Sequence, residues 1–580
     1  IYLARQLGTE RLADGRARIP AGLDPMLGPV ATAFGEIYQY VVTGPNVDAM
    51  SAKTTHDWEV RTRLRSVPGV SEVNTWGGET KQFQVVVDPS RLDQFRLSLG
   101  DVLQAVADNN QSFSGGFIEH HAERYTVRGI GLVADTRDLE RVVLASHNGV
   151  PVLLRDVAQI QVGAGLRDGA VTRNGQGEVV GGMVIMLKGQ NARDVAASVK
   201  TRLADIATTL PPGTTLEPFY DQTEVIDRTT ATLTKNLLEG SLLVVAVLFF
   251  FLRDVRASLI VAAVIPVSML VGFIGMRFFG VSANLMSLGA IDFGLIVDGA
   301  VVMMENFVRR RVGMGERLAH APADERDQVR LNMFKSAAVE VARPVLFGVL
   351  IIIAVYLPIF TLEGLEGKMF RPMAITVCTA LFGSLLLSLT AVPVVSSFLL
   401  PLEGHHTDEA WFVRLRDGYR RLLDTHMRHP LATIAVAVTI VAAALGSVPF
   451  LGTEFMPRLD EGSLLIETRK LPSVSLEESV EISTRVEQVV MKNFPEVSSI
   501  TTKIGRPDLA TEAMGIYQGD VYVGLHPIDD WTSGRTKPEL IDAMAEALSH
   551  IPGLEVNFTQ PMAMRLDEVV SGVKADVAVK

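Results

Sequence analysis

Six long apolar runs constrain the fold of this chain more than any other feature of its sequence. A bilayer core about 30 Å thick is crossed by about 20 helical residues, because each residue adds about 1.5 Å along the helix axis. Runs of this length therefore predict six membrane-spanning helices. They occupy residues 236–252, 257–276, 283–308, 344–362, 372–402 and 431–450.

The short connectors between these runs predict the orientation of the chain. Lys and Arg are retained on the cytoplasmic side, whereas long domains cross the membrane largely regardless of charge. The first, third and fifth connectors are the basic ones, with eight Lys and Arg residues in the connector 309–343 and five arginines between 414 and 428. An even number of spans returns the chain to the same side, so residues 1–235 and 451–580 are both expected to be periplasmic.

Composition agrees with a membrane protein and excludes other classes. The 580 residues are 48% hydrophobic with a mean hydropathy of +0.26, which is too apolar for a soluble or disordered chain. The net charge of −11 argues against a nucleic-acid partner, which would require an excess of Lys and Arg. Cys378 is the only cysteine, so any metal would have to use oxygen, imidazole or thioether ligands.

The two polar segments alternate strand-like and helix-like patterns, which is typical of α+β domains with a ferredoxin-like βαβ rhythm. The pattern also repeats, since residues 67–73 match residues 494–500 and both stretches follow an amphipathic helix. Repeats so far apart predict two homologous halves, each a membrane bundle with an external α+β domain. The expected domains are an external region at 1–235, five spans at 236–402, a surface helix at 403–430, a sixth span at 431–450 and a second external region at 451–580.

The predicted surface helix is amphipathic. Apolar residues recur at three- and four-residue steps between 411 and 427, and the arginines lie mostly between them. This spacing is typical of a helix that lies on the cytoplasmic leaflet of a membrane. An ordinary amphipathic helix packed on protein is the alternative.

Three carboxylates inside the third apolar run are the strongest functional signal: Asp292, Asp298 and Glu305. A carboxylate at membrane depth is usually neutralised, paired or part of a proton or ion pathway, because burying its charge is costly. On a helix Asp298 and Glu305 share a face, while Asp292 lies about 120° round the axis and about 9 Å along it from Asp298. Gly294 and Gly299 leave room for close helix approach or for water. We expect a ladder that passes protons stepwise.

The alternative for these acids is a structural role. Glu305 is close to the cytoplasmic end of the run, where it would cap the helix or pair with Arg309 or Arg310. Asp298 lies deep in the run among apolar neighbours, so a structural role fits it least well.

The run from Asp292 to Asn306, together with GTEFMPRLDEG at 452–462, resembles the heavy-metal efflux branch of the resistance-nodulation-division (RND) transporters. Further similar stretches are 35–40, 72–78, 219–223 and 564–573. The resemblance implies an RND fold with porter and docking subdomains outside the membrane. It also implies a homotrimeric inner-membrane proton antiporter, joined through a periplasmic adaptor to an outer-membrane channel. The chain is then expected to be a fragment that lacks the first span, the last porter subdomain and the final five spans.

The resemblance implies roles for the three acids. They fall on the positions that divalent-metal members of the family use as their proton pathway. Multidrug relatives have an Asp-Asp pair where this chain has Asp298 and Gly299, copper and silver relatives commonly have Ala in place of Gly299, and both lack an acid at the position of Asp292. The pattern is therefore similar to the cobalt, zinc, cadmium and nickel group.

Ligands for the transported ion are expected outside the membrane. By resemblance to the zinc members, Glu36 and Glu72 are candidates for a transient metal site, with Glu568 in the partner half, and solvated strand-edge charges are the alternative. The copper group has a Met close to the position of Gln518, where this chain has none, and Met514 is expected to be structural. Soft monovalent ions favour thioethers, whereas borderline divalent ions accept carboxylates.

The cluster Glu119-His-His-Ala-Glu123 also contains metal-binding residue types. Adjacent histidines on a strand point to opposite faces, which disfavours a shared site. We expect a hairpin in the docking region instead.

These observations predict a secondary transporter and not an enzyme, because the sequence has no Gly-rich phosphate loop with Lys-Ser/Thr. No cofactor is expected, since the proton-motive force would drive the export of a divalent metal cation. The alternatives are an RND pump for drugs or solvents, an RND pump for monovalent copper or silver, and a protein-translocation accessory.

Overall fold

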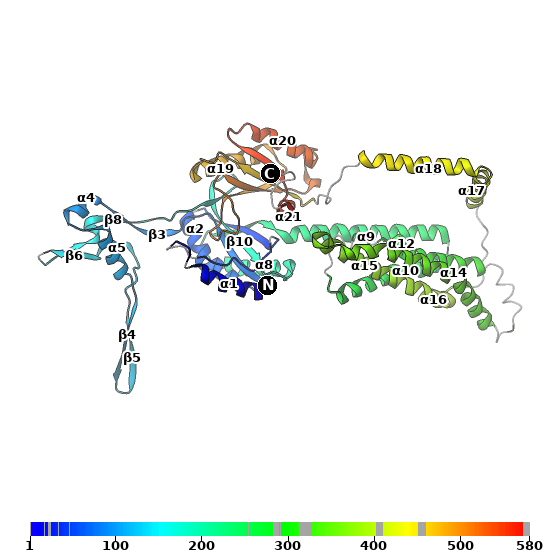
Figure 1. The fold of residues 1–580 in the computed structure, drawn as a ribbon, viewed down its shortest axis with the longest axis horizontal. Helices are drawn as coiled ribbons and strands as arrows, with labels where there is room; N and C mark the ends of the chain where they lie inside the picture. Colours follow the sequence, from blue (N-terminus) through cyan, green and yellow to red (C-terminus); the bar gives the residue numbers. More distant parts are fainter. Residues whose placement is uncertain are drawn as a thin grey trace. The chain divides into compact units, whose positions relative to one another are not determined.

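The computed structural model describes most of the chain, in two units (Figure 1). A β-rich unit comprises residues 1–225 and 458–580, and a helical unit comprises residues 226–457. The described residues are 2–16, 18–20, 25–32, 34–45, 47–147, 149–252, 254–281, 289, 292–311, 322, 326–401, 410–450 and 460–571.

The β-rich unit contains one supersecondary pattern twice. The second copy is made of β12 (Ser463–Arg469), α19 (Leu476–Asn493), β13 (Val497–Gly505), β14 (Gln518–Leu525), α20 (Lys537–Ser549) and β15 (Glu555–Thr559). Its strands pair antiparallel in the order β13-β14-β12-β15. This is the arrangement of a ferredoxin-like βαββαβ domain.

The first copy has the same strand order with an insertion in its middle. It is made of β1 (Glu36–Thr43), α2 (Ala49–Thr55), a π-helical turn (His56–Val60), α3 (Arg61–Arg65), β2 (Val70–Trp76), β10 (Glu178–Met186), α8 (Ala192–Ala207) and β11 (Thr215–Asp221). Its strands pair in the order β11-β1-β10-β2. A short strand, β9 (Gly169–Arg173), pairs with both β10 and β13, so the two copies form one continuous sheet.

The sequence repeat has the same backbone form in both copies. The N–H of Val70 donates to the carbonyl of Val67, and the N–H of Val497 donates to that of Phe494, each over 3.1 Å. The side chains of Val67 and Phe494 are both buried. The repeated apolar residue therefore closes the helix-to-strand turn onto each core.

The insertion is anchored by the antiparallel pair β3 (Lys81–Val87) and β8 (Ala158–Ala164). It has a small core of its own, to which Val102, Leu139 and Leu154 belong. Its other elements are α4 (Pro89–Gln94), α5 (Leu99–Asp108), β4 (Phe113–His120), β5 (Glu123–Gly129), α6 (Thr136–Glu140), β6 (Val143–His147), β7 (Val150–Leu153) and α7 (Leu154–Val157).

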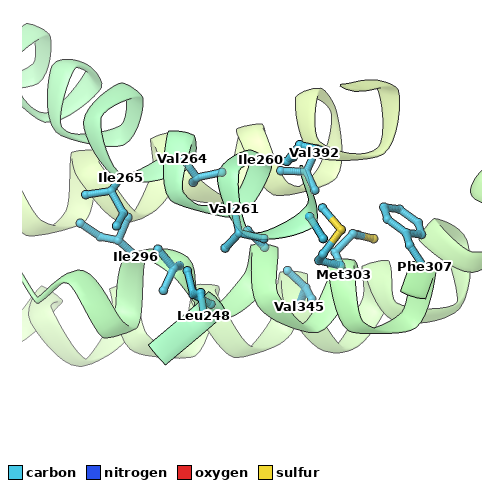
Figure 2. Close-up of a cluster of buried hydrophobic side chains, with 14 of the residues drawn as sticks. Leu248, Ile260, Val261, Val264, Ile265, Ile296, Met303, Phe307, Val345 and Val392 are labelled. Carbon is cyan, nitrogen blue, oxygen red and sulfur yellow. The ribbon is translucent and has the colours of Figure 1, made fainter. Parts of the chain in front are cut away.

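The helical unit has an apolar core that includes Val261, Ile296, Met303 and Phe307 (Figure 2). Its helices are α9 (Gln222–Leu252), α10 (Val255–Phe278), α12 (Phe293–Arg311), α14 (Arg326–Tyr356), α15 (Gly364–Leu389), α16 (Ala391–Leu399), α17 (Ala410–Arg428) and α18 (Pro430–Ser447). α9 begins in the β-rich unit and continues into the helical one.

Five helices among the described residues are long and apolar enough to cross a membrane, and each overlaps one of the predicted runs. They comprise residues 222–252, 255–278, 326–361, 366–389 and 430–450. The run 283–308 lies partly outside the described residues, and its part from Phe293 onward belongs to α12. The run 372–402 does not form one helix, because α15 ends at Leu389 and Thr390 leaves the helical conformation before α16. Pro393 has no N–H to donate to the carbonyl of Leu389, which favours this break.

Helices α10 and α15 contact each other through small residues. A Cβ atom on Gly275 would lie 2.7 Å from the Cβ of Thr379, and one on Gly383 would lie 2.8 Å from the Cβ of Val271. Non-bonded carbon atoms do not approach each other this closely in proteins. The two glycines therefore permit the close approach of these helices.

Replacing Gly275 or Gly383 by Ala is expected to destabilise the helical unit by about 1–3 kcal/mol, the usual cost of overpacking. Gly348→Ala is the matched control, because a Cβ there meets nothing within 4 Å. The melting temperature of the detergent-solubilised protein should fall for the first two variants only. Equal melting temperatures for all three variants would contradict this packing.

Candidate functional site

α12 carries its apolar residues on the side that packs against neighbouring helices. Ile296, Met303 and Phe307 are buried in the core of the helical unit, as Figure 2 shows. Ala300 lies on the same side and is fully buried. Because apolar residues occupy the packed side, the acids of α12 are left on the opposite one.

Asp298 and Glu305 are both exposed, on the shared face that their seven-residue spacing predicts. Within the described residues, neither forms a hydrogen bond or an ion pair. Asp292 precedes the helix, where its Oδ1 accepts a 2.8 Å hydrogen bond from the N–H of Gly294. Its carbonyl accepts the N–H of Ile296 over 3.2 Å, so Asp292 caps α12.

The pairing of Glu305 with Arg309 or Arg310 does not form. Arg310 instead donates to Glu340 of α14 over 2.5 Å, and Arg309 donates to Asn306 over 3.2 Å. The buried Asn306 also donates to Glu340, over 3.1 Å. The basic end of α12 is therefore held by Glu340, and Glu305 is not part of that network.

Gly299 allows helices to pack closely beside Asp298. A Cβ atom there would lie 3.0 Å from Val345 of α14 and 3.4 Å from the hydroxyl of Ser388 of α15. That hydroxyl is buried and has no hydrogen-bond partner among the described residues. Of the two roles expected for glycine here, close helix approach is the one seen at Gly299.

A second group of charged residues surrounds Arg565 of α21 (Pro561–Ser571) in the β-rich unit. The guanidinium donates to Glu36 over 2.6 Å, to Glu568 over 3.1 Å, and also to Glu512. Arg565, Glu36 and Glu512 are largely buried, whereas the Glu568 side chain is 37% exposed. One arginine thus holds three carboxylates, contributed by β1, by the segment before β14 and by α21. We call these four residues the Arg565 cluster.

Lys503 of β13 adds a second buried cation beside this cluster. Its Nζ lies 3.7 Å from Glu512 and 4.5 Å from the centre of the Trp76 ring. Burial alone would lower the pKa of Lys503, but the neighbouring carboxylates, Glu512 first, raise it above its usual value. Lys503 therefore stays charged and offsets part of the negative charge of the cluster.

Glu36 is the acid of the Arg565 cluster whose protonation responds to neutral pH. Burial and the nearby Glu512 carboxylate raise the pKa of Glu36 to about 7, against the opposing effect of Arg565 and Lys503. Glu36 therefore gains or loses a proton close to neutral pH.

Glu72 lies apart from the Arg565 cluster. Its Oε1 forms ion pairs with Arg61 and Arg65, with a nitrogen of each guanidinium 3.3 Å away. Glu36 and Glu72 are both paired in register with Ile185 of β10, so one strand separates them and their backbones lie about 10 Å apart. Glu36 and Glu568 thus bind the same arginine, Arg565. Glu72 binds Arg61 and Arg65 instead.

The described residues contain no group of three or more His, Cys, Asp or Glu side chains arranged to hold a metal ion. Met514 is buried beside Val41, Trp76 and Val171, as its structural interpretation requires. Gln518 accepts a 2.9 Å hydrogen bond from the N–H of Gly515.

Glu512, Lys503 and Arg565 were not predicted from the sequence to belong to a site. One weak signal was present, because Lys503 stands in the strand VSSITTKIG, and a lysine in a strand that is buried requires a nearby acid. The identity of that acid could not be read from the sequence, since Glu512 and Glu36 are far apart along the chain.

The histidine cluster forms the expected hairpin, but its two histidines are not adjacent residues of one strand. β4 ends at His120 and β5 begins at Glu123, so His121 and Ala122 form a two-residue turn with φ of 48° and 64°. The rings of His120 and His121 lie 4.1 Å apart. The expectation that they point to opposite faces of a strand was wrong, because His121 lies in the turn.

Comparison with known protein families matches residues 1–580 to the AcrB/AcrD/AcrF family. The chain belongs to this family. It is 43% identical to protein HelA of Legionella pneumophila and 39% identical to the cobalt-zinc-cadmium resistance protein CzcA of Cupriavidus metallidurans. Both matches cover the whole chain and 55% of the relative, so the chain spans about half the length of these proteins.

A solved structure of a heavy metal efflux pump matches the structure of this chain with a TM-score of 0.86 at 34% identity. The match covers 99% of this chain and 55% of that one. The RND transporter fold predicted from the sequence is therefore confirmed. So is the resemblance to the heavy-metal branch of the family.

The raised pKa of Glu36 predicts how stability depends on pH. Because the folded state holds this proton more tightly than the unfolded state, the contribution is present below about pH 4.5 and is lost as the pH rises through about 7. Glu36→Gln is neutral at every pH, so its melting temperature relative to the unsubstituted protein should be higher at pH 8 than at pH 5. Glu568→Gln, which removes a more exposed carboxylate from the same arginine, is the control. A Glu36→Gln difference that does not change with pH would refute the assignment.

Proposed function

We propose that the chain is part of an inner-membrane antiporter that exports divalent heavy-metal cations in exchange for protons. The main support is the face of α12 that carries Asp298 and Glu305. It presents two carboxylates on a helix at membrane depth, and neither has a basic partner among the described residues. Such acids are costly in a bilayer unless they can take up protons or are covered by polar groups.

The proposed mechanism uses these acids as proton carriers. Asp298 and Glu305 share one face, so a proton can move along the helix between them through water or through a neighbouring polar side chain. Asp292 lies at the start of the same helix and would exchange protons with the periplasmic side. Neutralised acids cost less in the bilayer than ionised ones, so proton loading would favour a different arrangement of the surrounding helices.

We propose Glu36, Glu72 and Glu568 as the transient ligands of the transported ion. Glu36 and Glu568 support this role best, because Arg565 already holds them together. A divalent cation would take the place of the guanidinium charge between the carboxylates. Protonation of Glu36 near neutral pH would then help to release the ion.

The relatives support a divalent substrate over the alternatives. CzcA is named for cobalt, zinc and cadmium and is 39% identical to the chain, whereas the cation efflux protein CusA of Escherichia coli is 34% identical. The carboxylates of the Arg565 cluster also suit borderline divalent ions better than monovalent copper or silver, which favour thioethers. An exporter of drugs or solvents would need no such group of acids outside the membrane.

The proposed assembly follows the family. We propose a homotrimer in the bacterial inner membrane with the β-rich unit in the periplasm, joined to a periplasmic adaptor and an outer-membrane channel. We further propose that the segment works within a longer chain, since the relatives it matches continue beyond it.

Asp298→Asn is expected to abolish metal export, because an amide cannot carry a proton. Asp327→Asn is the matched control, since Asp327 is an exposed acid at the start of α14. Metal uptake into inverted vesicles under an imposed pH gradient measures the effect in the full-length transporter. Transport by Asp298→Asn at the rate of the control would remove the proton role.

Selectivity provides a second test. In proteoliposomes under reducing conditions, zinc or cobalt is expected to be transported faster than monovalent copper, because the proposed ligands are carboxylates. Glu36→Gln together with Glu568→Gln should slow this transport without preventing trimer assembly. Copper transport equal to or faster than that of the divalent ions would contradict the proposed substrate.

A further inference from the structure

Glu487 of α19 is a fully buried acid that lies where the two copies of the ferredoxin-like fold meet. Its Oε1 accepts hydrogen bonds from the hydroxyl groups of Thr172 in β9 and Thr502 in β13, both over 2.6 Å. These two threonines are partners in the antiparallel register of β9 and β13. One carboxyl oxygen therefore bridges the strand pairing through which the two copies form one sheet.

The other carboxyl oxygen of Glu487 binds the turn that leads from β9 into β10. Oε2 accepts the N–H of Gly175 over 2.8 Å, and the neighbouring Gln488 donates to the carbonyl of Gly175 over 2.9 Å. Gly175 has φ of 69°, and a Cβ atom there would lie 2.6 Å from the Cγ of Gln488. The absence of a side chain at Gly175 therefore permits this close contact with α19.

The charged residues next to the two threonines lie on the other face of the sheet. Arg173 of β9 and Lys503 of β13 each follow one of the threonines directly, and successive side chains of a strand point to opposite faces. Arg173 pairs with Glu217, and Lys503 lies beside the Arg565 cluster. Neither cation is therefore placed to balance the charge of Glu487.

The other elements around Glu487 also leave its charge unpaired. Glu178 of β10 is the register partner of Thr172, but Arg167 binds its carboxylate. The turn after β9 contains no charged residue, and the residues of α19 one helical turn before and after Glu487 are uncharged. The side chains that α20 buries against α19 are apolar. Within the described residues, Glu487 forms no ion pair.

The site can hold both forms of the acid. Burial raises the pKa of Glu487 to about 7, and the hydrogen bonds from the threonines and from Gly175 act in the opposite direction. Three donors suit the ionised carboxylate. A hydroxyl group can also turn and accept a hydrogen bond, so the threonines can satisfy the protonated acid as well. A change of protonation therefore needs no change of partners.

We propose that Glu487 is a proton-binding site that controls how firmly the two copies of the fold are joined. Opening the joint would expose the carboxyl group to water and return its pKa to about 4.5, the ordinary value. The closed joint holds the proton more tightly than the open one, so protonation stabilises the closed joint. This contribution is present below about pH 4.5 and is lost as the pH rises through about 7. The proposal does not depend on the transported substrate.

Hydrogen exchange of the purified protein measures how firmly the joint is closed. Rates for peptides 169–177 and 497–505, corrected for the intrinsic pH dependence of exchange, give the protection of the pairing between β9 and β13. This protection should be at least about tenfold lower at pH 8 than at pH 5, because the pKa of Glu487 in the closed joint lies between these values. Peptides from β12 and β14, which pair inside the second copy, report whether the fold is intact.

Glu487→Gln should remove the pH dependence of protection at the joint, because an amide does not titrate. Glu481→Gln, which changes an exposed glutamate of the same helix, is the matched control and should retain it. Thr172→Val removes one donor to the ionised carboxylate, so it should raise the pH at which protection is lost. A role of Glu487 in packing alone would not move this pH.

Equal pH dependence in Glu487→Gln and in its control would overturn the proposal. So would a loss of protection at the same pH in Thr172→Val and in the unsubstituted protein. The Thr172→Val comparison decides the question alone if Glu487→Gln does not fold.

Discussion

Charge within apolar surroundings is the constraint on which the arrangement of both units depends. In the helical unit, Asp254 accepts two N–H groups at the start of α10 and lies 2.7 Å from Arg311 at the end of α12. In the β-rich unit, Arg565 and Lys503 hold the buried acids Glu36 and Glu512. A buried charge without a partner strongly destabilises the folded state, so each of these charges is paired. Among the described residues, Asp298 and Glu305 have no such partner, which is the physical reason to propose a function for them.

The duplicated ferredoxin-like fold gives the β-rich unit its scaffold. Each copy buries an apolar core between its sheet and its helices, and β9 extends one sheet into the other. The junction is polar inside. Glu487 of α19 is fully buried and accepts hydrogen bonds from Thr172 and Thr502, and burial raises its pKa to about 7. The two halves are thus joined by backbone pairing and by the Glu487 carboxyl group, whose charge depends on pH. One of its partners, Thr502, directly precedes Lys503 in β13.

The local features of the sequence predicted local structure well. The repeat at 67–73 and 494–500 located two equivalent turns, because an apolar residue that follows an amphipathic helix is most stable when it is buried in the core next to that helix. The histidine turn was misjudged at one residue, since strand periodicity stops where the backbone adopts positive φ at His121.

For the candidate site, the sequence alone determined that Asp298 and Glu305 share a face of one helix, because helical periodicity depends only on spacing. It also determined that the chain has long apolar helices and duplicated α+β domains, since both follow from local pattern. Only the tertiary structure decided that Arg310 binds Glu340 rather than Glu305, and that Glu36, Glu512 and Glu568 meet at Arg565. Pairings of this kind join residues up to 529 positions apart. They depend on how the strands and helices stack, which no local pattern specifies.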